Sequence, residues 1–507
     1  MAESAPRPIR RLLVANRGEI AVRVMRACRE HGIVPIAVHS SIDRGALHVR
    51  EADEAIEIGG PAPAESYLRV DAILNAAATT RADAIHPGYG FLSENAGFAA
   101  ACRDAGVIFV GPPPEAITAM GSKLGARERM ERAGVPVVPG ATPADQSDAG
   151  VRAAALAIGL PVMVKASAGG GGKGMRVVTD VASLDESIAA ARREAQRAFG
   201  DGTLYVERRV ERPRHVEIQI FADTHGGCVH LFERECSIQR RHQKIVEETP
   251  SPALTPALRA RMGEAAVAAA RAAGYVNAGT IEFLLDGAGD DARFYFLEMN
   301  TRLQVEHAIT EAITGVDLVH AQIAVAGGAP LPWRQDQLAP RGHAIEARLC
   351  AEDPDQGFLP QAGTLVACRF PHIPGLRVDG GVTRGDTIPV QYDSLIAKIV
   401  AHAATRAAAI ARLEAALART VVFGIRTNQT LLTRILGHPR FRAGDVDTGF
   451  IADEQATLLG EQTLAGAGAA AAIAAWVAQQ GDGGAGASAI APGVDANPWT
   501  ALRGWRG

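Results

Sequence analysis

The sequence predicts an α/β and α+β protein, with a doubly wound parallel sheet at the N-terminus, a central region of antiparallel strands, and a C-terminal region that mixes strands and helices. Two observations carry this prediction. Short apolar runs alternate with helix-length amphipathic segments over the first 110 residues. From residue 210 onward, strand-like runs of alternating polarity predominate, until two helix-like stretches appear between 404 and 436.

The parallel sheet is predicted from the order of its elements. An apolar run at 9–15 predicts the first strand, and the apolar spacing between Glu19 and His31 predicts a helix. The other expected elements are strands at 33–39, 83–86 and 107–110, and a helix from its N-cap Ser93 to Ala105. Alternation of strands and helices favours a sheet with helices on both faces.

Changes in the sequence pattern divide the rest of the chain. After Gly111 the chain is helical, and from residue 138 a small α/β unit surrounds a glycine-rich loop. The expected divisions are an N-terminal domain at 1–110, a helical linker at 111–137, the small α/β unit at 138–210, a strand-rich core at 211–335, a C-terminal domain at 336–453, and an Ala/Gly-rich tail at 454–507.

The composition excludes several classes of function. Of 507 residues, 47% are hydrophobic and 21% are charged, and the net charge of −4 gives no basic field for nucleic acid or an anionic membrane. The sequence has no apolar run of about 18 residues or more and no apolar signal core at its N-terminus, so we expect a cytoplasmic protein. The six cysteines are dispersed without a CxxC pair, which argues against a disulfide framework or a zinc site.

Lysine is rare in this chain. Only five of the 52 basic residues are lysines, at Lys123, Lys165, Lys173, Lys244 and Lys398. Because arginine fills the generic basic positions, a retained lysine indicates a place that needs a compact ammonium group. Chance is the alternative for any single lysine, but all five lie in segments that are unusual for other reasons.

A glycine-rich loop, GGGGKG at 169–174, follows the strand-like run 161–168. It matches GxGxxG, but the following MRVVTD favours a strand where a dinucleotide-binding loop needs a helix. The P-loop pattern fails as well, because glycine follows Lys173 where Ser or Thr is needed. A hairpin tip with few side chains lets backbone N–H groups reach phosphate oxygens, with Lys165 beside them, and a flexible tip without function is the alternative.

Acidic side chains mark a second hairpin. The runs 280–285 and 294–300 flank the polar turn GAGDD, which predicts two antiparallel strands. Glu298 and Asn300 then share a face, and Glu282 on the partner strand lies beside them. Three oxygen ligands without thiols or imidazoles suit Mg²⁺ or Mn²⁺ bridging nucleotide phosphates, and a solvent-facing polar edge is the alternative.

The residues after Asn300 predict an oxyanion site. Arg302, whose guanidinium can grip a planar oxyanion, is followed by Gln304 and by Glu306, a candidate proton acceptor. This combination fits activation of a small oxyacid such as bicarbonate, whereas a surface salt bridge between Arg302 and Glu306 is the alternative. The cation-rich segment 233–244 carries interleaved acids, which counts against RNA binding and favours anion contacts in a cleft.

Together these motifs resemble the biotin carboxylase family of the ATP-grasp superfamily. The resemblance covers residues 9–453 in family order, in the segments ANRGEIA (15–21), HPGYGFLSENA (86–96), MGSK (120–123), VKASAGGGGKGMR (164–176), PRHVEIQI (213–220), ERECSIQRRHQKIVEE (233–248), IEFL (281–284), EMNTRLQVEH (298–307), HAIEARLCAEDP (343–354) and YDSLIAKIV (392–400). It implies that the N-terminal sheet is a pre-ATP-grasp domain, that 138–210 is the ATP-grasp lid and 211–335 its core, and that 336–453 is the biotin carboxylase C-terminal domain.

The resemblance also implies site residues for ATP, two Mg²⁺ or Mn²⁺ ions, bicarbonate and biotin. ATP contacts are implied for Lys123, Lys165, Gly171, Gly172, His215, Gln239, His242 and Leu284, with Glu207, Arg208, Arg209 and Val210 near the adenine. Metal ligation is implied for Glu282, Glu298 and Asn300, bicarbonate binding for Lys244, Arg302, Gln304 and the Val305 backbone, with Glu306 as the base, and biotin contacts for Arg348 and Tyr89. Arg208 and Arg209 depart from the family, which often has a lysine and an aromatic residue there.

The implied reaction is ATP-dependent carboxylation of biotin with bicarbonate through carboxyphosphate, the first half-reaction of an acyl-CoA carboxylase. None of the five lysines lies in a Met-Lys-Met sequence, so the implied partners are a biotin carboxyl carrier domain or protein and a carboxyltransferase subunit. A homodimer is implied, and neither nucleic acid nor membrane is an expected partner. The tail 493–507 resembles the connection to further domains in acyl-CoA carboxylase α subunits. Another bicarbonate-phosphorylating ATP-grasp ligase and an inactive nucleotide-binding scaffold are the alternatives.

Overall fold

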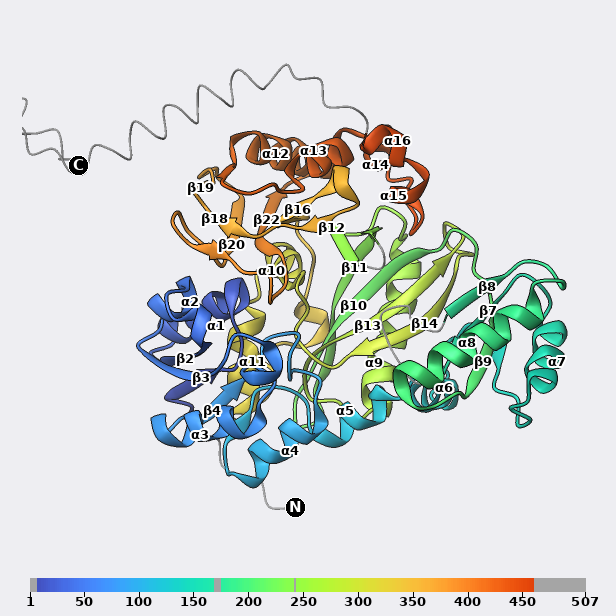
Figure 1. Ribbon diagram of the computed structural model, residues 1–507, viewed down its shortest axis with the longest axis horizontal. Coiled ribbons are helices and arrows are strands. Elements are labelled where there is room, and N and C mark those ends of the chain that lie inside the picture. The colour runs from blue at the N-terminus through green and yellow to red at the C-terminus, as the bar shows by residue number, and fades with distance from the viewer. Residues whose placement is uncertain (1–6, 168–174, 241–242, 460–507) are drawn as a thin grey trace, which may run out of the picture. The chain divides into compact units, whose positions relative to one another are not determined.

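The computed structural model describes residues 7–167, 175–240 and 243–459. Gly171, Gly172 and His242, for which ATP contacts are expected, lie outside these residues, as does the tail from residue 460. The described residues form three main sheets, with helices packed against them (Figure 1).

The N-terminal elements form a parallel sheet of five strands in the order β3-β2-β1-β4-β5, which confirms the predicted fold class for this region. Its strands are β1 (Arg11–Val14), β2 (Val34–Ser40), β3 (Glu54–Gly59), β4 (Ala84–His86) and β5 (Ile108–Phe109). Its helices are α1 (Gly18–Glu30), α2 (Leu47–Arg50), α3 (Val70–Thr80) and α4 (Ala96–Asp104).

Two features of this sheet differ from the expectation. The strand β3 was not expected. It is an edge strand in which Ile56, Glu57 and Ile58 alternate in polarity, but Ile58 is its one buried side chain. Helix α4 begins later than expected, since Asn95 rather than Ser93 is its N-cap. The Asn95 side chain accepts a hydrogen bond from the Phe98 backbone N–H at 2.8 Å, which satisfies one of the free donors at the start of the helix.

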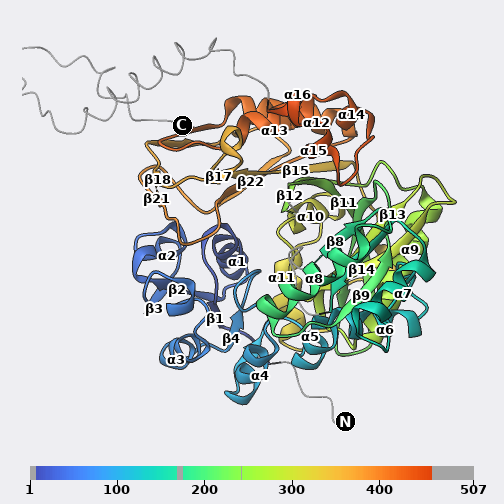
Figure 2. The same ribbon diagram turned by 45° about the vertical axis from the view of Figure 1, so that its right-hand side comes forward.

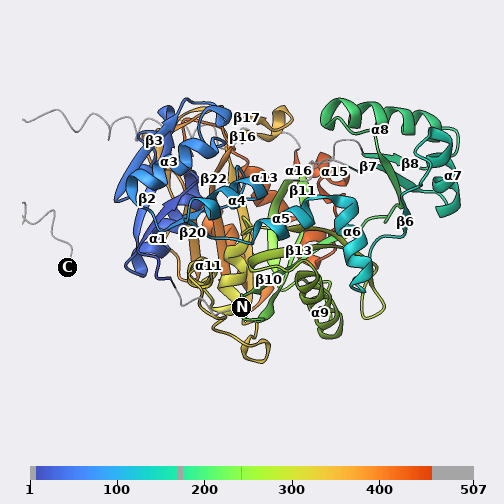
Figure 3. The ribbon, with the colours of Figure 1, turned by 90° about the horizontal axis from the view of Figure 1, so that it is seen from below.

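A second, four-stranded sheet has the order β6-β9-β7-β8, and Figure 3 shows its strands β6, β7 and β8 next to α7 and α8. It follows two helices, α5 (Pro114–Gly121) and α6 (Lys123–Arg132). Its elements are β6 (Gly140–Ala141), α7 (Asp148–Ile158), β7 (Val162–Ala166), β8 (Met175–Val178), α8 (Leu184–Phe199) and β9 (Leu204–Arg208). The antiparallel pairing of β7 with β8 confirms that a strand, not a helix, follows the glycine-rich loop.

The third sheet has eight strands in the order β14-β13-β10-β11-β12-β15-β22-β20, with every neighbouring pair antiparallel. Its strands are β10 (Arg214–Ala222), β11 (Cys228–Arg240), β12 (Gln243–Thr249), β13 (Asn277–Asp286), β14 (Arg293–Asn300), β15 (His343–Cys350), β20 (Leu376–Gly380) and β22 (Leu395–Ala403). The hairpin β13–β14 confirms the predicted carboxylate-bearing pair of strands. The sheet runs without a break from strands before residue 336 to strands after it.

Helices and short strands complete the described chain. Helices α12 and α13 pack on β15 and β22 through a shared apolar core (Figure 2), which confirms the two helices expected between 404 and 436. The helices of this half are α9 (Pro256–Ala272), α10 (His307–Thr314), α11 (Leu318–Ala326), α12 (Arg406–Arg419), α13 (Gln429–Gly437), α14 (Pro439–Ala443), α15 (Phe450–Asp453) and α16 (Gln455–Leu458). The short strands are β16 (Glu352–Asp353), β17 (Leu359–Pro360), β18 (Gly363–Thr364), β19 (Ala367–Arg369), β21 (Thr387–Ile388) and β23 (Val421–Phe423).

Within the described ranges, no single helix is long and apolar enough to cross a membrane; α10 and α11 meet that test only as a pair, bent by 98°.

Candidate active site

Two cavities bring together most of the expected site residues. The larger, of about 540 Å³, has among its lining residues Glu19, Tyr89, Lys244, Arg302, Val305 and Arg348. The smaller, of about 230 Å³, has among its lining residues Lys123, Lys165, Glu207, His215, Gln239, Glu282 and Glu298. Residues implied for bicarbonate and biotin therefore gather in one cavity, and residues implied for ATP and metal gather in the other.

Lys244 on β12 connects the two cavities. Its Nζ lies 2.8 Å from Glu282 Oε1, 2.7 Å from Glu306 Oε1 and 2.5 Å from Glu217 Oε2. Burial by itself lowers the pKa of Lys244, but the three carboxylates outweigh this effect and hold the pKa well above its usual value. The cavity wall thus keeps a permanent cation where an anionic substrate can meet it.

Glu306 lies between two cations and is fully buried. Its Oε1 contacts Lys244, and its Oε2 lies 2.9 Å from Nη2 of Arg348 on β15. Arg348 also donates through Nε to Glu247 Oε1 at 2.6 Å. Burial acts to raise the pKa of Glu306, but Lys244, Arg348 and Arg234 outweigh it, so the pKa lies well below its usual value and the carboxylate is ionised.

Arg302 is held by neighbouring polar side chains, in a network that reaches Glu282, the partner of Lys244. Its Nη1 donates to Gln304 Oε1 at 2.9 Å, its Nη2 donates to Asn300 Oδ1 at 3.0 Å, and its Nε donates to Glu94 Oε2 at 3.2 Å. Gln304 in turn donates to Glu282 Oε1 at 3.4 Å. The guanidinium is therefore oriented beside the carboxylate hairpin rather than paired with Glu306, so the surface salt bridge Arg302–Glu306 does not form.

The hairpin β13–β14 supplies oxygen donors for a metal. Asn300 Nδ2 donates to Glu282 Oε1 at 2.9 Å, and Glu298, opposite Glu282 in the strand register, is exposed to the smaller cavity. Such donors fit Mg²⁺ or Mn²⁺. A nitrogen donor is also close, because His215 Nε2 lies 3.0 Å from Glu282 Oε2, and one ligand atom from each of His215, Glu217 and Glu282 lies within 4.8 Å of the other two.

The smaller cavity has cations on the side of the four-stranded sheet. Lys165 Nζ lies 2.5 Å from Glu207 Oε2. Lys123 is the first residue of α6, and it interacts electrostatically with Glu298. Burial lowers the pKa of Lys123 despite that carboxylate. On the opposite side, Gln239 Nε2 lies 2.6 Å from His215 Nδ1. This charge pattern suits a polyanionic ligand that brings its own metal ions.

Four expected nucleotide contacts are not among the described residues that line either cavity: Arg208, Arg209, Val210 and Leu284. Arg208 donates to the Tyr295 hydroxyl at 2.8 Å. The Arg209 backbone N–H donates to the Pro161 carbonyl, which ties the end of β9 to the start of β7. Leu284 is opposite His215 in the β10–β13 register, so it lies on the same face of the sheet as that histidine.

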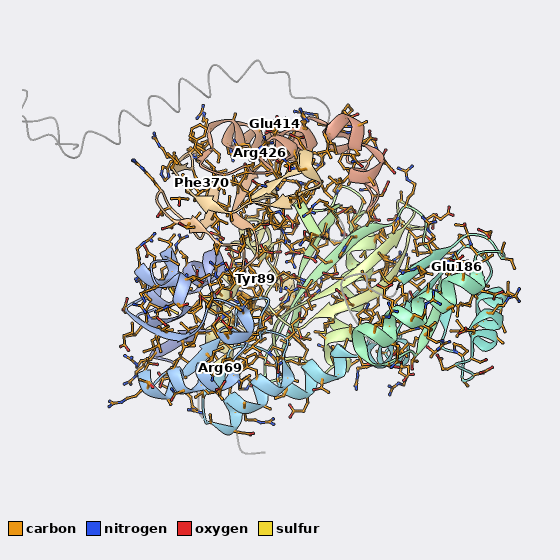
Figure 4. All side chains as sticks on the ribbon, viewed as in Figure 1. Arg69, Tyr89, Glu186, Phe370, Glu414 and Arg426 are labelled. Carbon is orange, nitrogen blue, oxygen red and sulfur yellow. The ribbon has the colours of Figure 1, made fainter. Side chains whose placement is uncertain are left out.

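Tyr89 lies where the N-terminal elements meet the large sheet (Figure 4). Its hydroxyl donates to the carboxylate of Glu19, the fifth residue of the ANRGEIA segment. Burial raises the pKa of Glu19 to about 7 even though Lys398 opposes that shift. Glu19 had no role in the sequence-based assignment, yet it lines the larger cavity next to the tyrosine.

Glu217 and Arg234 were also missed from the sequence. Both are fully buried, and Arg234 Nε donates to Glu217 Oε1 at 2.5 Å while its other nitrogens donate to Gln219, Thr310 and Thr280. A signal was available, because His215 and Glu217 alternate along one strand-like segment and so share a face. The sequence of this segment does not show that Glu217 and Arg234 are completely buried in the folded protein.

A large antiparallel sheet and a smaller sheet that together hold lysines, a carboxylate hairpin and a neighbouring arginine define an ATP-grasp enzyme. Three stretches of the chain match known families: residues 8–117 match "Biotin carboxylase, N-terminal domain", 122–334 match "Carbamoyl-phosphate synthase L chain, ATP binding domain", and 346–453 match "Biotin carboxylase C-terminal domain". The chain belongs to the biotin carboxylase family.

Known relatives support that membership along most of the chain. A biotin carboxylase of Nostoc sp. is 52% identical over 441 residues, which cover 87% of this chain and 98% of that protein. The mitochondrial methylcrotonoyl-CoA carboxylase subunit alpha of Dictyostelium discoideum is 50% identical over 457 residues, 90% of this chain but only 65% of that protein. Among solved structures, the biotin carboxylase domain dimer of Hydrogenobacter thermophilus 2-oxoglutarate carboxylase, in complex with MgADP, ADP and bicarbonate, superposes with a TM-score of 0.85 at 43% identity, over 90% of this chain and 99% of that one.

Proposed function

We propose that this chain catalyses the ATP-dependent carboxylation of biotin by bicarbonate. The observation that carries the proposal is the position of Lys244, whose ammonium group bridges Glu282 on the metal side and Glu306 on the oxyanion side. An enzyme that transfers a phosphoryl group to bicarbonate has to hold both substrates at one charged junction. The relatives named biotin carboxylase, and the neighbour solved with MgADP and bicarbonate, support the same reaction.

The carboxylate hairpin and the lysines would hold the nucleotide. Glu282, Glu298 and Asn300 present the oxygen donors for Mg²⁺ or Mn²⁺. When bound, these ions neutralise charge on the phosphates as the γ-phosphoryl group is transferred. Lys123 and Lys165 add positive charge on the opposite wall of the smaller cavity, where they oppose the negative charge of the same phosphates.

Bicarbonate would be held by Arg302, Gln304, Lys244 and the Val305 backbone. A bicarbonate oxygen attacks the γ-phosphorus, ADP leaves, and the product is carboxyphosphate, while the proton of bicarbonate passes to Glu306. While Glu306 is ion-paired with Lys244, the low pKa of Glu306 makes this carboxylate a weak base. Bicarbonate therefore has to draw the lysine toward itself, which raises the basicity of Glu306 when the base is needed.

The second step would take place around Arg348 and Tyr89 in the larger cavity. Carboxyphosphate breaks down to CO₂ and phosphate, the phosphate removes the N1′ proton of biotin, and N1′ then attacks CO₂. The negative charge that develops on the ureido oxygen is stabilised by the guanidinium of Arg348, which lines this cavity. Tyr89, held by Glu19, lies in the same cavity and would contact the ureido ring.

We also propose partners for the whole protein. The chain spans about 65% of the length of the methylcrotonoyl-CoA carboxylase relative, so a biotin carrier, a carboxyltransferase and an acyl-CoA acceptor are proposals for the whole protein. A homodimer is proposed because a related domain is described as a dimer.

We also propose domains at 1–110, 138–210, 211–335 and 336–453, with the linker 111–137 and the tail 454–507. A cytoplasmic location stays a prediction, since the relatives include mitochondrial enzymes.

Release of ADP tests the proposed function directly. With ATP, Mg²⁺ and free biotin, ADP release should require bicarbonate and should increase with the biotin concentration. The carboxylated biotin should be detected with ¹⁴C-bicarbonate in the same reactions. Equal ADP release with and without bicarbonate would show that the chain is not a biotin carboxylase.

A further inference from the structure

Lys398 on β22 has no role in the proposed reaction, although it is fully buried. A buried ammonium group is costly unless its partners compensate for the lost hydration. Arginine fills almost every other basic position of this chain, and the other described lysines, Lys123, Lys165 and Lys244, all line the two cavities. This position therefore calls for a compact ammonium group rather than for any positive charge.

The Lys398 ammonium group joins three segments that are far apart in the sequence. Its Nζ donates to the Val305 carbonyl at 2.6 Å, lies 3.3 Å from Glu19 Oε2, and lies 4.0 Å from Asp379 Oδ2. These partners come from the turn before α10, from α1 and from β20. Arg348 is directly opposite Lys398 in the β15–β22 register, so both side chains lie on one face of the sheet.

Two of these contacts lead to residues that line the larger cavity. The Val305 carbonyl belongs to the peptide bond between Val305 and Glu306, so a fixed carbonyl orients the Val305 backbone and the start of Glu306 together. Glu19 accepts the hydrogen bond of the Tyr89 hydroxyl. The Lys398 ammonium group thus contacts Val305, a proposed bicarbonate contact, and Glu19, which accepts the hydrogen bond of Tyr89, a proposed biotin contact.

We propose that Lys398 is a positioning residue for bicarbonate and biotin, which acts by fixing the Val305 carbonyl and the Glu19 carboxylate in place. The inference rests on the proposed function, because that function assigns bicarbonate and biotin to the larger cavity. Within the described chain, the contacts of Lys398 include none of the residues that line the smaller cavity. The binding of nucleotide should therefore not depend on it.

The variant Lys398→Met tests the role, because methionine fills similar space without charge or donor. Losing a charge-assisted hydrogen bond to Val305 should raise the KM for bicarbonate by about 10-fold or more. The KM for free biotin should rise as well, and the KM for ATP should stay unchanged. A residue that only stabilised the fold would lower the yield of active enzyme and the apparent kcat, with all three KM values unchanged, and that result would overturn the proposal.

Arg406→Met is the matched control. Arg406 pairs with buried Glu248 at 2.6 Å and 2.9 Å, on the same large sheet, but it lines neither cavity. Its loss removes the arginine from a buried carboxylate, which keeps its contact with His343 Nε2 at 2.8 Å. It should lower the melting temperature while leaving the three KM values as in the wild type.

The double variant Lys398→Met/Glu19→Gln covers the case in which the single variant does not fold. It removes both charges of the closest pair, so no buried charge is left without its partner there. If Lys398 positions Val305, the melting temperature recovers but the KM for bicarbonate stays raised, because the Val305 carbonyl still lacks its donor. A wild-type KM for bicarbonate in the double variant would mean that Lys398 only balances charge.

The wild-type protein separates this inference from the proposed function. If the wild type shows no bicarbonate-dependent ADP release, the proposed function itself has failed. If the wild type is active and Lys398→Met keeps the wild-type KM for bicarbonate, only the inference has failed.

Discussion

Arg348 contacts the proposed base Glu306 and also lines the proposed biotin cavity. A variant at this position can therefore distinguish ATP cleavage from biotin carboxylation. Its contact with Glu306 helps to keep that carboxylate ionised, whereas its proposed role in the second step is to stabilise the enolate of biotin. These roles differ in what they require. The first needs only some cation near Glu306, which Lys244 still provides at 2.7 Å, and the second needs a donor at the ureido oxygen.

We therefore expect Arg348→Ala to reduce carboxylation of free biotin by about 100-fold or more, while bicarbonate-dependent ATP cleavage persists. Loss of the guanidinium should also raise the pKa of Glu306, so the acidic limb of the ATP-cleavage profile should move to higher pH. Both activities are measured on the same preparation, by ADP release and by ¹⁴C incorporation into biotin. Equal loss of the two activities would contradict the separate roles.

At the scale of the secondary-structure elements, strand β15 places a buried glutamate beside another buried glutamate on β12. Glu346 is opposite Glu247 in the β12–β15 register, and both are fully buried. Neither carboxyl oxygen of Glu346 has a hydrogen-bond partner among the described residues. Burial raises the pKa of Glu346 well above its usual value, and Lys398 opposes this only in part, because Glu247 adds to the shift.

This shift predicts how stability depends on pH. The folded protein keeps a proton on Glu346 that the unfolded chain releases above about pH 4.5, so the contribution is complete at low pH and is lost as the pH rises toward the raised pKa. Glu346→Gln cannot lose that proton. It should match the wild type near about pH 5 and exceed its stability by at least about 1 kcal/mol near about pH 9. Denaturant unfolding at the two pH values checks this, and an unchanged difference between the two proteins would show that Glu346 is ionised in the fold.

The elements also show what the sequence could and could not predict. The hairpin β13–β14 was predictable because alternation of polarity and a polar turn are local signals, and they place Glu282 and Asn300 correctly relative to each other. The pairing of β12 with β15 brings residues about a hundred positions apart into register, and no local pattern encodes it. For that reason Lys244 and Arg348 were each recognisable, but their shared contact with Glu306 was not. The contacts of Lys398 with Glu19 and Val305 are non-local for the same reason.

At the scale of the whole molecule, the larger cavity takes its walls from the N-terminal elements, the carboxylate hairpin side and the strands after residue 336. None of these regions alone presents Tyr89, Arg302 and Arg348 together. The eight-stranded sheet supplies the connection, since it runs from β14 to β20 through strands on both sides of the proposed division at 336. We therefore expect carboxylation to depend on the packing of these regions against one another.

We expect biotin ligase to attach no biotin to any lysine of this chain. Lys398 is fully buried, Lys244 is bonded to three carboxylates, and Lys165 is bonded to Glu207, so an incoming ligase cannot reach their amines in the folded protein. No lysine of the chain lies in a Met-Lys-Met sequence either. After incubation with ligase, ATP and biotin, a streptavidin blot should show label on a carrier domain added as the positive control and none on this chain. That labelled carrier should then accept ¹⁴C from bicarbonate only when this chain is present, whereas biotin on the chain itself would mean that one of its own lysines serves as the carrier.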